Sequence, residues 1–325
     1  MDAVGPNPQT LQEAILYFAV PANCLNYLVA RRPEWKDGVV CPTCGSKKVS
    51  FLKNQLRWQC SARHPKRQFS VKVGTIFEDS PLGLDKWLPC VWLITNAKNG
   101  ISSYEIARAL DVTQKTAWFM LHRVRLAHQG KQTTKFTGVV EADETFIGGK
   151  IANMHLDKQT RARMGKVRVG GTEGKTVVMG LLDRNTKKAR IKVLPNTRAF
   201  HVRTHVIANV EKGSTVYSDS LRSYRNLPVD GYVHEFIDHT EKYVEGQVHT
   251  NGLENFWSLL KRALKGTYVS VEPFHLQAYC DEQVFRFNHR KLTDAERFDL
   301  GIRAICGKRI TYAELIGKTD SSSEG

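Results

Sequence analysis

The sequence lacks any long apolar run. None of its stretches approaches the roughly 18 consecutive apolar residues that a membrane-spanning helix requires. The most apolar stretch near the N-terminus, residues 14–20, follows a segment without a basic residue, so it does not resemble a signal peptide. We therefore expect no membrane partner and, by default, a location in the cytoplasm or nucleoid.

Cysteine is scarce, with seven in 325 residues, and the number is odd. Three of the seven fall in one short window, whereas Cys24, Cys90, Cys280 and Cys306 are scattered along the chain. An odd count without an export signal argues against a framework of disulfide bonds.

Acidic residues are missing from residues 41–77, although the whole chain has 32 of them. The same stretch carries eight basic residues: Lys47, Lys48, Lys53, Arg57, Arg63, Lys66, Arg67 and Lys72. Overall, 48 Lys and Arg residues give a net charge of +16 and a pI near 9.6. A block of one sign gains little from pairing within the chain and favours phosphate binding over a merely solvated surface. We expect Lys47, Lys48, Arg63 and Arg67 to contact DNA.

The clustered cysteines supply three of the four ligands in a zinc-binding pattern. Cys41 and Cys44 make a CxxC knuckle followed by Gly45, and Cys60 and His64 make a second arm after fifteen intervening residues. Zn²⁺ takes four tetrahedral sulfur and nitrogen ligands, which two closely spaced pairs can supply. The pattern predicts one structural zinc in a ribbon, with His64 the weakest of the four ligands. A redox CxxC or chance spacing is the alternative.

Residues 101–125 have the pattern of a helix-turn-helix. Ser102 or Ser103 can cap a first helix, residues 111–112 make the turn, and Thr113 can cap a second helix. The exposed face of the second helix would present Gln114, Lys115 and Trp118 to base edges, while Arg123 and Arg125 could reach phosphates. An ordinary helical hairpin is the alternative, because such patterns are common.

Three acidic residues stand out by their context. Asp143 lies at the end of an apolar strand, Asp219 ends a second strand at residues 215–219, and Glu254 begins a helical stretch. Each alone is more often a turn or cap residue. Strand alternation places Glu141 on the same face as Asp143 and Glu144 on the other face, so Glu141 remains a rival by pattern.

Two Asp and one Glu suit a pair of Mg²⁺ or Mn²⁺ ions, because these ions prefer oxygen ligands and keep several waters. Two such ions about 3.5–4 Å apart activate the attacking oxygen and stabilise the leaving oxygen in phosphodiester cleavage. Asp143 would bridge the ions, and Asp219 and Glu254 would each hold one. Lys261, two helical turns after Glu254, would contact the DNA backbone.

The periodicity divides the chain into five parts and predicts a mixed α/β fold for the largest. The parts are an N-terminal helical segment (1–38), a zinc ribbon (39–79), a helix-turn-helix module (80–130), a catalytic domain (131–310) and a flexible tail (311–325). The catalytic domain carries a basic insertion near residues 150–175.

The three acidic blocks resemble the catalytic blocks of DDE transposases of zinc-ribbon bacterial insertion sequences, which are related to the Merlin elements. The blocks are residues 140–149, 217–219 and 251–262, with 34 residues between Asp219 and Glu254. The order of ribbon, helix-turn-helix and ribonuclease-H-like domain is also similar to that family.

The resemblance implies that Asp143, Asp219 and Glu254 are the metal-binding triad and that Lys261 follows it on the helix. His249 or Asn251 could add to metal binding or orient a ligand. The resemblance further implies recognition of terminal inverted repeats, water-mediated cleavage at the element end and strand transfer by the freed 3′ hydroxyl. Two DNA ends must be paired, so a homodimer or larger assembly is implied. A non-catalytic DNA-binding regulator and a nuclease that cuts without joining remain the competing readings.

Overall fold

A computed structural model describes residues 6–130, 134–148, 175–219, 222–237 and 249–318 of the chain. The chain divides into two compact units: residues 1–130 together with 289–325, and residues 131–288. Apart from Lys175, the basic insertion expected near residues 150–175 lies outside the described residues. Among the described residues, no helix combines the length and apolar character needed to cross a membrane.

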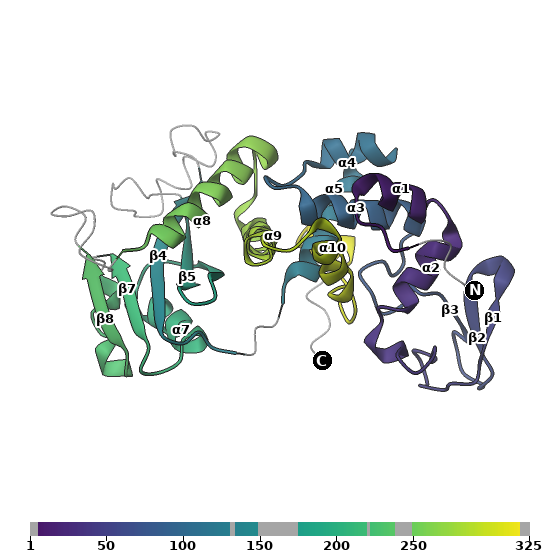
Figure 1. Cartoon of the computed structure of the whole chain (residues 1–325), viewed down its shortest axis with the longest axis horizontal. Helices are drawn as coiled ribbons and strands as arrows, with labels where there is room; N and C mark the ends of the chain where they lie inside the picture. The colour runs from purple at the N-terminus through teal and green to yellow at the C-terminus, as the bar shows by residue number, and fades with distance from the viewer. Residues whose placement is uncertain (1–5, 131–133, 149–174, 220–221, 238–248, 319–325) are drawn as a thin grey trace. The chain divides into compact units, whose positions relative to one another are not determined.

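The second unit is built on a five-stranded mixed sheet with the strand order β6-β5-β4-β7-β8. The strands are β4 (Val139–Ile147), β5 (Thr176–Asp183), β6 (Lys188–Leu194), β7 (Thr215–Asp219) and β8 (Val233–Ile237). Strands β4, β5 and β6 pair antiparallel, whereas β7 and β8 run parallel to β4 (Figure 1). This arrangement is ribonuclease-H-like, so the predicted fold class is confirmed.

Helices cover both faces of this sheet. Helix α7 (Ala199–Asn209) packs on the face that carries Val140 and Ala142. Helices α8 (Asn251–Arg262) and α9 (Leu276–Asn288) pack on the opposite face, and Figure 1 shows α8 running across the sheet. Because side chains alternate along a strand, Glu141 and Asp143 face α8 whereas Glu144 points to the other face, as the sequence predicts.

The first unit contains a three-stranded antiparallel ribbon of β1 (Val49–Leu52), β2 (Arg57–Cys60) and β3 (Gln68–Phe69). The ring of Trp58 lies 5.1–6.0 Å from the rings of Trp35, Phe51 and Phe69. These aromatic residues belong to the same core as the neighbouring helices of the unit. The ribbon is therefore part of a larger packed body, a point that its sequence does not reveal.

The helix-turn-helix pattern is present in the first unit as α4 (Ser103–Leu110) and α5 (Gln114–His128). Ser102 caps α4 in a reciprocal capping box with Glu105, and the Thr113 side chain accepts the amide of Thr116 at the start of α5. Asp111 takes a left-handed conformation, with φ of 48°, in the turn between the helices. The predicted caps and turn are thus confirmed.

The N-terminal stretch with helical spacing forms two helices instead of one. Helix α1 (Leu11–Phe18) ends before Pro21, which begins α2 (Pro21–Val29). Proline lacks an amide donor and is favoured in the first turn of a helix, so it separates the two segments here. Both helices pack against α3 (Leu84–Asn96).

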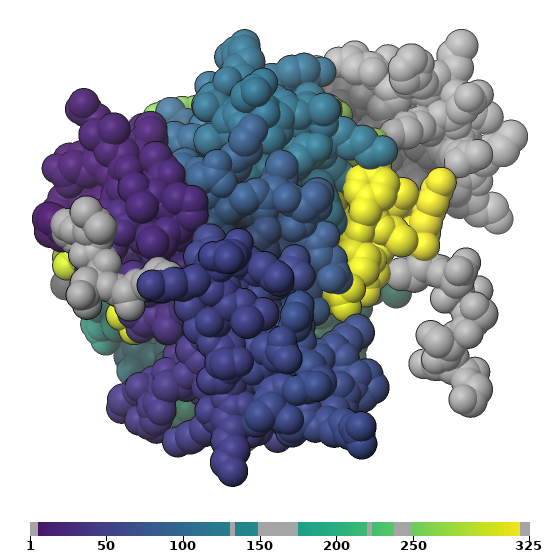
Figure 2. Space-filling view, turned by 90° about the vertical axis from the view of Figure 1, so that its right-hand side faces the viewer, coloured from purple at the N-terminus to yellow at the C-terminus, as the bar shows by residue number. Residues whose placement is uncertain are grey.

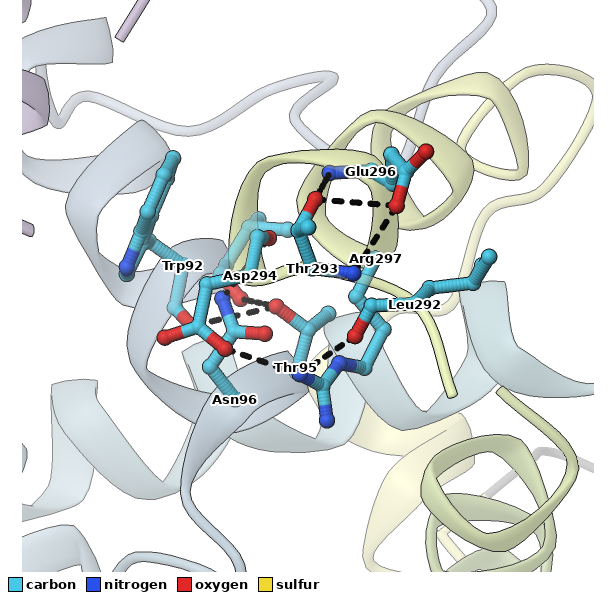
Figure 3. Close-up of polar contacts among 9 residues, drawn as sticks. Trp92, Thr95, Asn96, Leu292, Thr293, Asp294, Glu296 and Arg297 are labelled. Atoms are coloured by element: carbon cyan, nitrogen blue, oxygen red, sulfur yellow. Dashed lines mark hydrogen bonds and ion pairs between the residues drawn. The ribbon is translucent and has the colours of Figure 1, made fainter. Parts of the chain in front are cut away.

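Helix α10 (Asp294–Arg303) belongs to the first unit, although the sequence predicts a catalytic domain that extends to residue 310. Phe298 packs 4.9 Å from the ring of Trp92, and Gly301 lets α10 approach α3, because a Cβ there would lie 2.9 Å from Thr95. Figure 3 shows the start of α10 beside the end of α3, where the Asn96 side chain donates to the carbonyl of Asp294. The division at residue 288 follows from these contacts, which local sequence does not indicate.

The first residues of the predicted flexible tail (311–325) form a short helix. Helix α11 (Tyr312–Leu315) is capped by Thr311, and Tyr312 packs 5.7 Å from the ring of Phe119 on α5. The Lys308 amine donates to the carbonyl oxygens of Ala127 and Gln129. In Figure 2 the yellow C-terminal atoms accordingly lie against the blue atoms of the helical region. Residues 319–325 lie outside the described residues.

Candidate metal and nucleic-acid sites

The four residues of the predicted zinc site come together in the first unit. The ligand atoms of Cys41, Cys44, Cys60 and His64 all lie within 4.8 Å of one another. The Cys44 and Cys60 sulfurs are 3.6 Å apart, and the Cys41 sulfur is 3.5 Å from Nε2 of His64. A tetrahedral zinc site has ligand-to-ligand distances of about 3.5–3.8 Å, given Zn–S and Zn–N bonds of about 2.3 and 2.0 Å. The donor set therefore fits Zn²⁺.

Local backbone geometry explains why these residues converge. Gly45 has a φ of +71°, and its amide donates to the carbonyl of Cys41 at 2.8 Å, which closes the knuckle. Nδ1 of His64 lies 2.6 Å from the carbonyl of Pro65, so the protonated Nδ1 donates there and Nε2 faces the sulfurs. Burial opposes ionisation of Cys41, but hydrogen bonds from the backbone of Cys44 and Thr43 and from neighbouring thiols lower its pKa to about 6.

The second cluster lies on the sheet of the second unit. Carboxylate oxygens of Asp143 on β4 and Asp219 on β7 lie within 4.8 Å of each other and of an oxygen of Glu144. Strands β4 and β7 are parallel neighbours, with Glu141 paired to Tyr217, so the residues two positions further on come to the same end of the sheet. The structure thus brings the two predicted aspartates together. Asp143 lies in the middle of a longer strand, not at its end as expected, because β4 continues to Ile147.

Helix α8 packs directly over Asp143. Oδ2 of Asp143 accepts a hydrogen bond of 2.8 Å from the indole of Trp257, and Oδ1 accepts the amide of Glu144. Gly180 of β5 pairs with Asp143 across the sheet, and a Cβ at this glycine would lie 2.8 Å from Leu253 and Trp257. The glycine therefore leaves the room that the indole occupies beside the carboxylate.

The electrostatics of this cluster suit a cation. Burial, together with the Asp219 and Glu254 carboxylates, raises the pKa of Asp143 to about 6 against the hydrogen bonds from Trp257 and Glu144. Burial and the repulsion from Asp219 and Asp143 raise the pKa of Glu144 to about 8, against the hydrogen bond that it accepts from Tyr224. Crowded carboxylates that oppose one another's ionisation gain most from a bound cation, and carboxylate oxygen is the ligand that Mg²⁺ and Mn²⁺ prefer.

The third predicted acid, Glu254, sits in the first turn of α8 and is exposed. It is close enough to raise the pKa of Asp143, but it lies outside the group that gathers within 4.8 Å. Lys261 is exposed in the last turn of the same helix. Glu144 takes the third place in that tight group, and its link to the buried Tyr224 of a distant segment gives no signal in the sequence.

The predicted DNA-contacting residues of α5 differ in exposure. Lys115 is exposed, and its amine lies 4.7 Å over the ring of Tyr312. Gln114 is half-buried and donates to the Ser103 hydroxyl, while Trp118 is half-buried with its ring 4.4 Å from that of His122. Of the described α5 residues, Lys115 is thus the most accessible of the three expected base readers.

Two arginines that were expected to reach phosphates are buried instead. Arg123 is 5% exposed and donates to the carbonyl oxygens of Ile76 and Glu78, which ties α5 to the segment after the ribbon. Arg125 is 1% exposed. Periodicity places both arginines on the helix but does not show which neighbours cover them, so the expectation of phosphate contact is wrong for this conformation.

The basic block of the ribbon is mostly accessible. Lys47, Lys48, Arg63 and Arg67 are exposed, and the Arg67 guanidinium also donates to the Cys60 carbonyl. Lys72 differs, because its amine donates to the carbonyl oxygens of Ser80 and Leu82. The four residues expected to contact DNA therefore remain available at the surface.

Comparison with known proteins gives two domain matches. Residues 135–288 match the ISXO2-like transposase domain, and residues 22–63 match the transposase zinc-ribbon domain. An uncharacterised protein in transposable element ISH50 of Halobacterium salinarum is 29% identical over 71% of this chain and 79% of its own length. An uncharacterised transposase-like protein of Haemophilus influenzae is 31% identical over 31% of this chain and 80% of its own length.

A solved structure of a simian T-cell lymphotropic virus intasome in complex with PP2A regulatory subunit B56 gamma also aligns with part of the chain. The identity is 10%, the TM-score is 0.29, and the alignment covers 55% of this chain and 63% of that chain. A likeness this low carries no weight for the assignment. The two matched domains, in the order ribbon and then catalytic domain, place the chain in the family of zinc-ribbon DDE transposases of insertion sequences.

Proposed function

We propose that the protein binds the terminal inverted repeats of its element, cleaves the 3′ end in a metal-dependent reaction and joins that end to target DNA. The observation that carries the proposal is the pair Asp143 and Asp219, whose oxygens lie within 4.8 Å on neighbouring strands of a ribonuclease-H-like sheet. These two aspartates would hold divalent ions, which would supply the charge stabilisation that phosphoryl transfer needs.

Asp143, Asp219 and Glu254 would together hold two Mg²⁺ or Mn²⁺ ions. Between the two candidates for the third acid, Glu254 is favoured by its exposure on the face of Asp143, because a ligand there can reach ions, water and DNA together. Glu144 points to the opposite face and accepts a hydrogen bond from Tyr224. The bound ions would supply charge stabilisation for the attacking and leaving oxygens.

The chemistry divides into two displacements at phosphorus. In the first, a water oxygen attacks the phosphorus at the element end, the bond from phosphorus to the 3′ oxygen breaks, and the element keeps a 3′ hydroxyl. In the second, that hydroxyl oxygen attacks a target phosphorus and displaces the target's own 3′ oxygen. Lys261, exposed on α8, would hold the DNA backbone near these atoms.

The first unit would supply DNA binding. A structural Zn²⁺ held by Cys41, Cys44, Cys60 and His64 would fix the ribbon, and the ribbon would present Lys47, Lys48, Arg63 and Arg67 to phosphates. Helix α5 would present Lys115, with Gln114 and Trp118 beside it, to base edges. Because two element ends must be brought together, we propose a homodimer or a larger assembly on DNA.

The test is a cleavage and joining assay with a duplex that carries the element's own end, a target plasmid and Mg²⁺. The wild-type protein should give both cleaved and joined products, whereas Asp143→Asn, Asp219→Asn and Glu254→Gln should bind the end and lose cleavage by at least about 1,000-fold. Glu144→Gln is the matched control for the third acid and should retain cleavage.

Each other result would favour a different function. Cleavage without joining would indicate a nuclease, and binding without cleavage in Mg²⁺ and Mn²⁺ would indicate a regulator. If Glu144→Gln abolished cleavage and Glu254→Gln did not, Glu144 would replace Glu254 as the third acid. Cleavage retained by both aspartate variants would refute the proposed site.

A further inference from the structure

Arg184 lies at the point where the three acid-bearing elements of the second unit meet. It follows directly after β5, and its amide donates to the carbonyl of Val139 at the start of β4. Its guanidinium Nε donates to Oε1 of Glu141 at 2.8 Å, and its Cζ lies 4.8 Å over the ring of Tyr217. Glu141 and Tyr217 each stand two residues before a predicted metal ligand, one on β4 and one on β7.

The same guanidinium reaches the segment that leads into α8. A terminal nitrogen of Arg184 lies 2.7 Å from Nδ1 of His249 and donates to the His249 carbonyl at 2.6 Å. His249 precedes Thr250, the N-cap residue of α8. Arg184 thus fixes the residue that leads into the helix carrying Glu254. Nδ1 of His249 faces the arginine.

Glu141 completes this connection at the helix itself. The Thr250 side chain makes no capping hydrogen bond, and the Asn251 amide has a long hydrogen bond of 3.4 Å to Nδ1 of His249. Instead, Oε2 of Glu141 accepts the amide of Leu253 in the first turn, at 3.1 Å. A carboxylate at a helix N-terminus is favourable because it meets free amides and the positive end of the helix dipole.

Gly252 allows the carboxylate to come this close. A Cβ at residue 252 would lie 2.7 Å from Oε2 of Glu141. The Glu141 side chain is 3% exposed and that of Arg184 is 14% exposed, so their ion pair is shielded from solvent. The cap is therefore a buried, tertiary contact between the strand of Asp143 and the helix of Glu254.

We propose that Arg184 and Glu141 are positioning residues, which set the distance of Glu254 from Asp143 and Asp219 and thereby the affinity of the acid cluster for divalent ions. The inference rests on the proposed metal-dependent function, but the contacts that carry it lie within the protein, so it can be tested on the protein alone. Supporting residues of this kind typically change metal affinity by about 10–100-fold when they are removed.

Arg184→Met and Glu141→Gln test the proposal, with Arg190→Met as the matched control. Arg190 of β6 is also a buried arginine beside an aromatic ring, 4.0 Å over Phe136, and it binds the carbonyl oxygens of Thr134 and Asn209 away from α8. The readouts are the hydrogen-exchange rates of amides 251–254 in the full-length protein without Mn²⁺ and the midpoint of Mn²⁺ binding followed by electron paramagnetic resonance.

Arg184→Met should speed exchange of these amides and raise the Mn²⁺ midpoint by about 10-fold. Arg190→Met should lower the melting temperature and leave both readouts near the wild-type values. Arg184→Lys keeps the charge and a single donor nitrogen in place of the guanidinium fork, so it should restore part of the affinity. It also decides the question if the Met variant does not fold. Unchanged exchange and midpoint in the Arg184 variants, or equal changes in Arg190→Met, would overturn the proposal.

Failure of the proposed function gives a different result. If the wild-type protein binds Mn²⁺ through Asp143 but does not cleave an element end, transposition is refuted while exchange and Mn²⁺ binding still decide the role of Arg184. If the wild-type protein cleaves and Arg184→Met has the wild-type Mn²⁺ dependence, the function stands and the positioning role is refuted.

Discussion

The zinc cluster of the first unit and the acid cluster of the second unit are assembled in opposite ways. The ligands of the zinc cluster come from two tight turns within residues 41–64, and each pair is set by its local backbone. The acids come from β4, β7 and α8, which span more than a hundred residues, and packed elements hold them in place. In the ribbon, hydrogen bonds to Cys41 lower its pKa, whereas burial among other acids raises the pKa of Asp143.

This difference implies two roles for metal: zinc would stabilise the fold of the ribbon, whereas divalent ions would bind to acids that the folded second unit already holds in place. The ribbon has short strands and a complete set of four ligands, so its metal closes the fold locally. The sheet of the second unit has apolar cores on both faces, so the acids are held without metal. Loss of metal should therefore damage the first cluster's fold and only the second cluster's function.

The largest expected effect is the loss of zinc from the ribbon. Cys44→Ala should weaken zinc binding by several kcal/mol and speed amide exchange across residues 41–69, since zinc sites of this kind contribute about 10 kcal/mol or more to folding. Cys44 is exposed, so the loss comes from the metal and not from core packing. Hydrogen exchange by mass spectrometry measures the effect, with exposed Thr43→Ala as the control. Equal exchange in Cys44→Ala and wild type would remove the distinction between the clusters.

A smaller effect is expected from the pH dependence of the acid cluster. The folded pKa of Glu144 is about 8, above its ordinary value of 4.5, so its contribution to stability is present below pH 4.5 and is lost as pH rises through 8. Glu144→Gln stays neutral and can still accept the hydrogen bond from Tyr224. Without added Mg²⁺ and with zinc in place, the free energy of unfolding of the variant should rise above that of wild type between pH 4.5 and 8, by on the order of 3 kcal/mol.

Chemical denaturation at a series of pH values checks this gain. The gap in free energy of unfolding between Glu144→Gln and wild type should be near zero at pH 4.5 and widest above pH 8. A gap of the same size at every pH would show that the surroundings do not raise the pKa of Glu144. The Glu144 carboxylate would then resemble the Cys41 thiolate of the first cluster, which hydrogen bonds stabilise.

A third effect concerns packing next to the acids. Gly180→Ala places a Cβ 2.8 Å from the side chains of Leu253 and Trp257, so it should cost about 1–3 kcal/mol and displace the indole from Asp143. Mg²⁺ should not restore the lost stability, because the defect lies in the packing. The melting temperature of the second unit measures the cost. Gly266→Ala, where a new Cβ meets no atom within 4 Å, is the matched control and should be nearly neutral.

The same contrast explains what the sequence could predict. Turns, caps and ligand spacing are local, so the CxxC knuckle, the cap at Thr113 and the alternation along β4 follow from neighbouring residues. The pairing of β7 with β4 brings Asp219 to Asp143 across 75 intervening residues, an expectation that came from the chemistry of the three acids and from the resemblance of their motifs, not from any local signal.

Contacts between distant segments were not predictable in the same way. The place of Arg184 beside Glu141 and His249 depends on the antiparallel register of β5 with β4 and on the approach of α8. The return of α10 to the first unit depends on Phe298 fitting the core beside Trp92. Neither contact is marked by a periodicity or a motif, because each depends on which distant segment packs against the side chain.

The smallest expected effect is on the salt dependence of DNA binding by the ribbon. Each lysine that neutralises one phosphate contributes about 0.9 to the slope of log affinity against log salt, so Lys47→Ala with Lys48→Ala should reduce the slope by about 1.8. Lys72 belongs to the same basic block, but its amine is held by the carbonyl oxygens of Ser80 and Leu82. Lys72→Met should therefore lower stability and leave the slope unchanged. If all three lysines changed the slope equally, charge alone, and not the exposure that the zinc-held ribbon creates, would govern binding by the first unit.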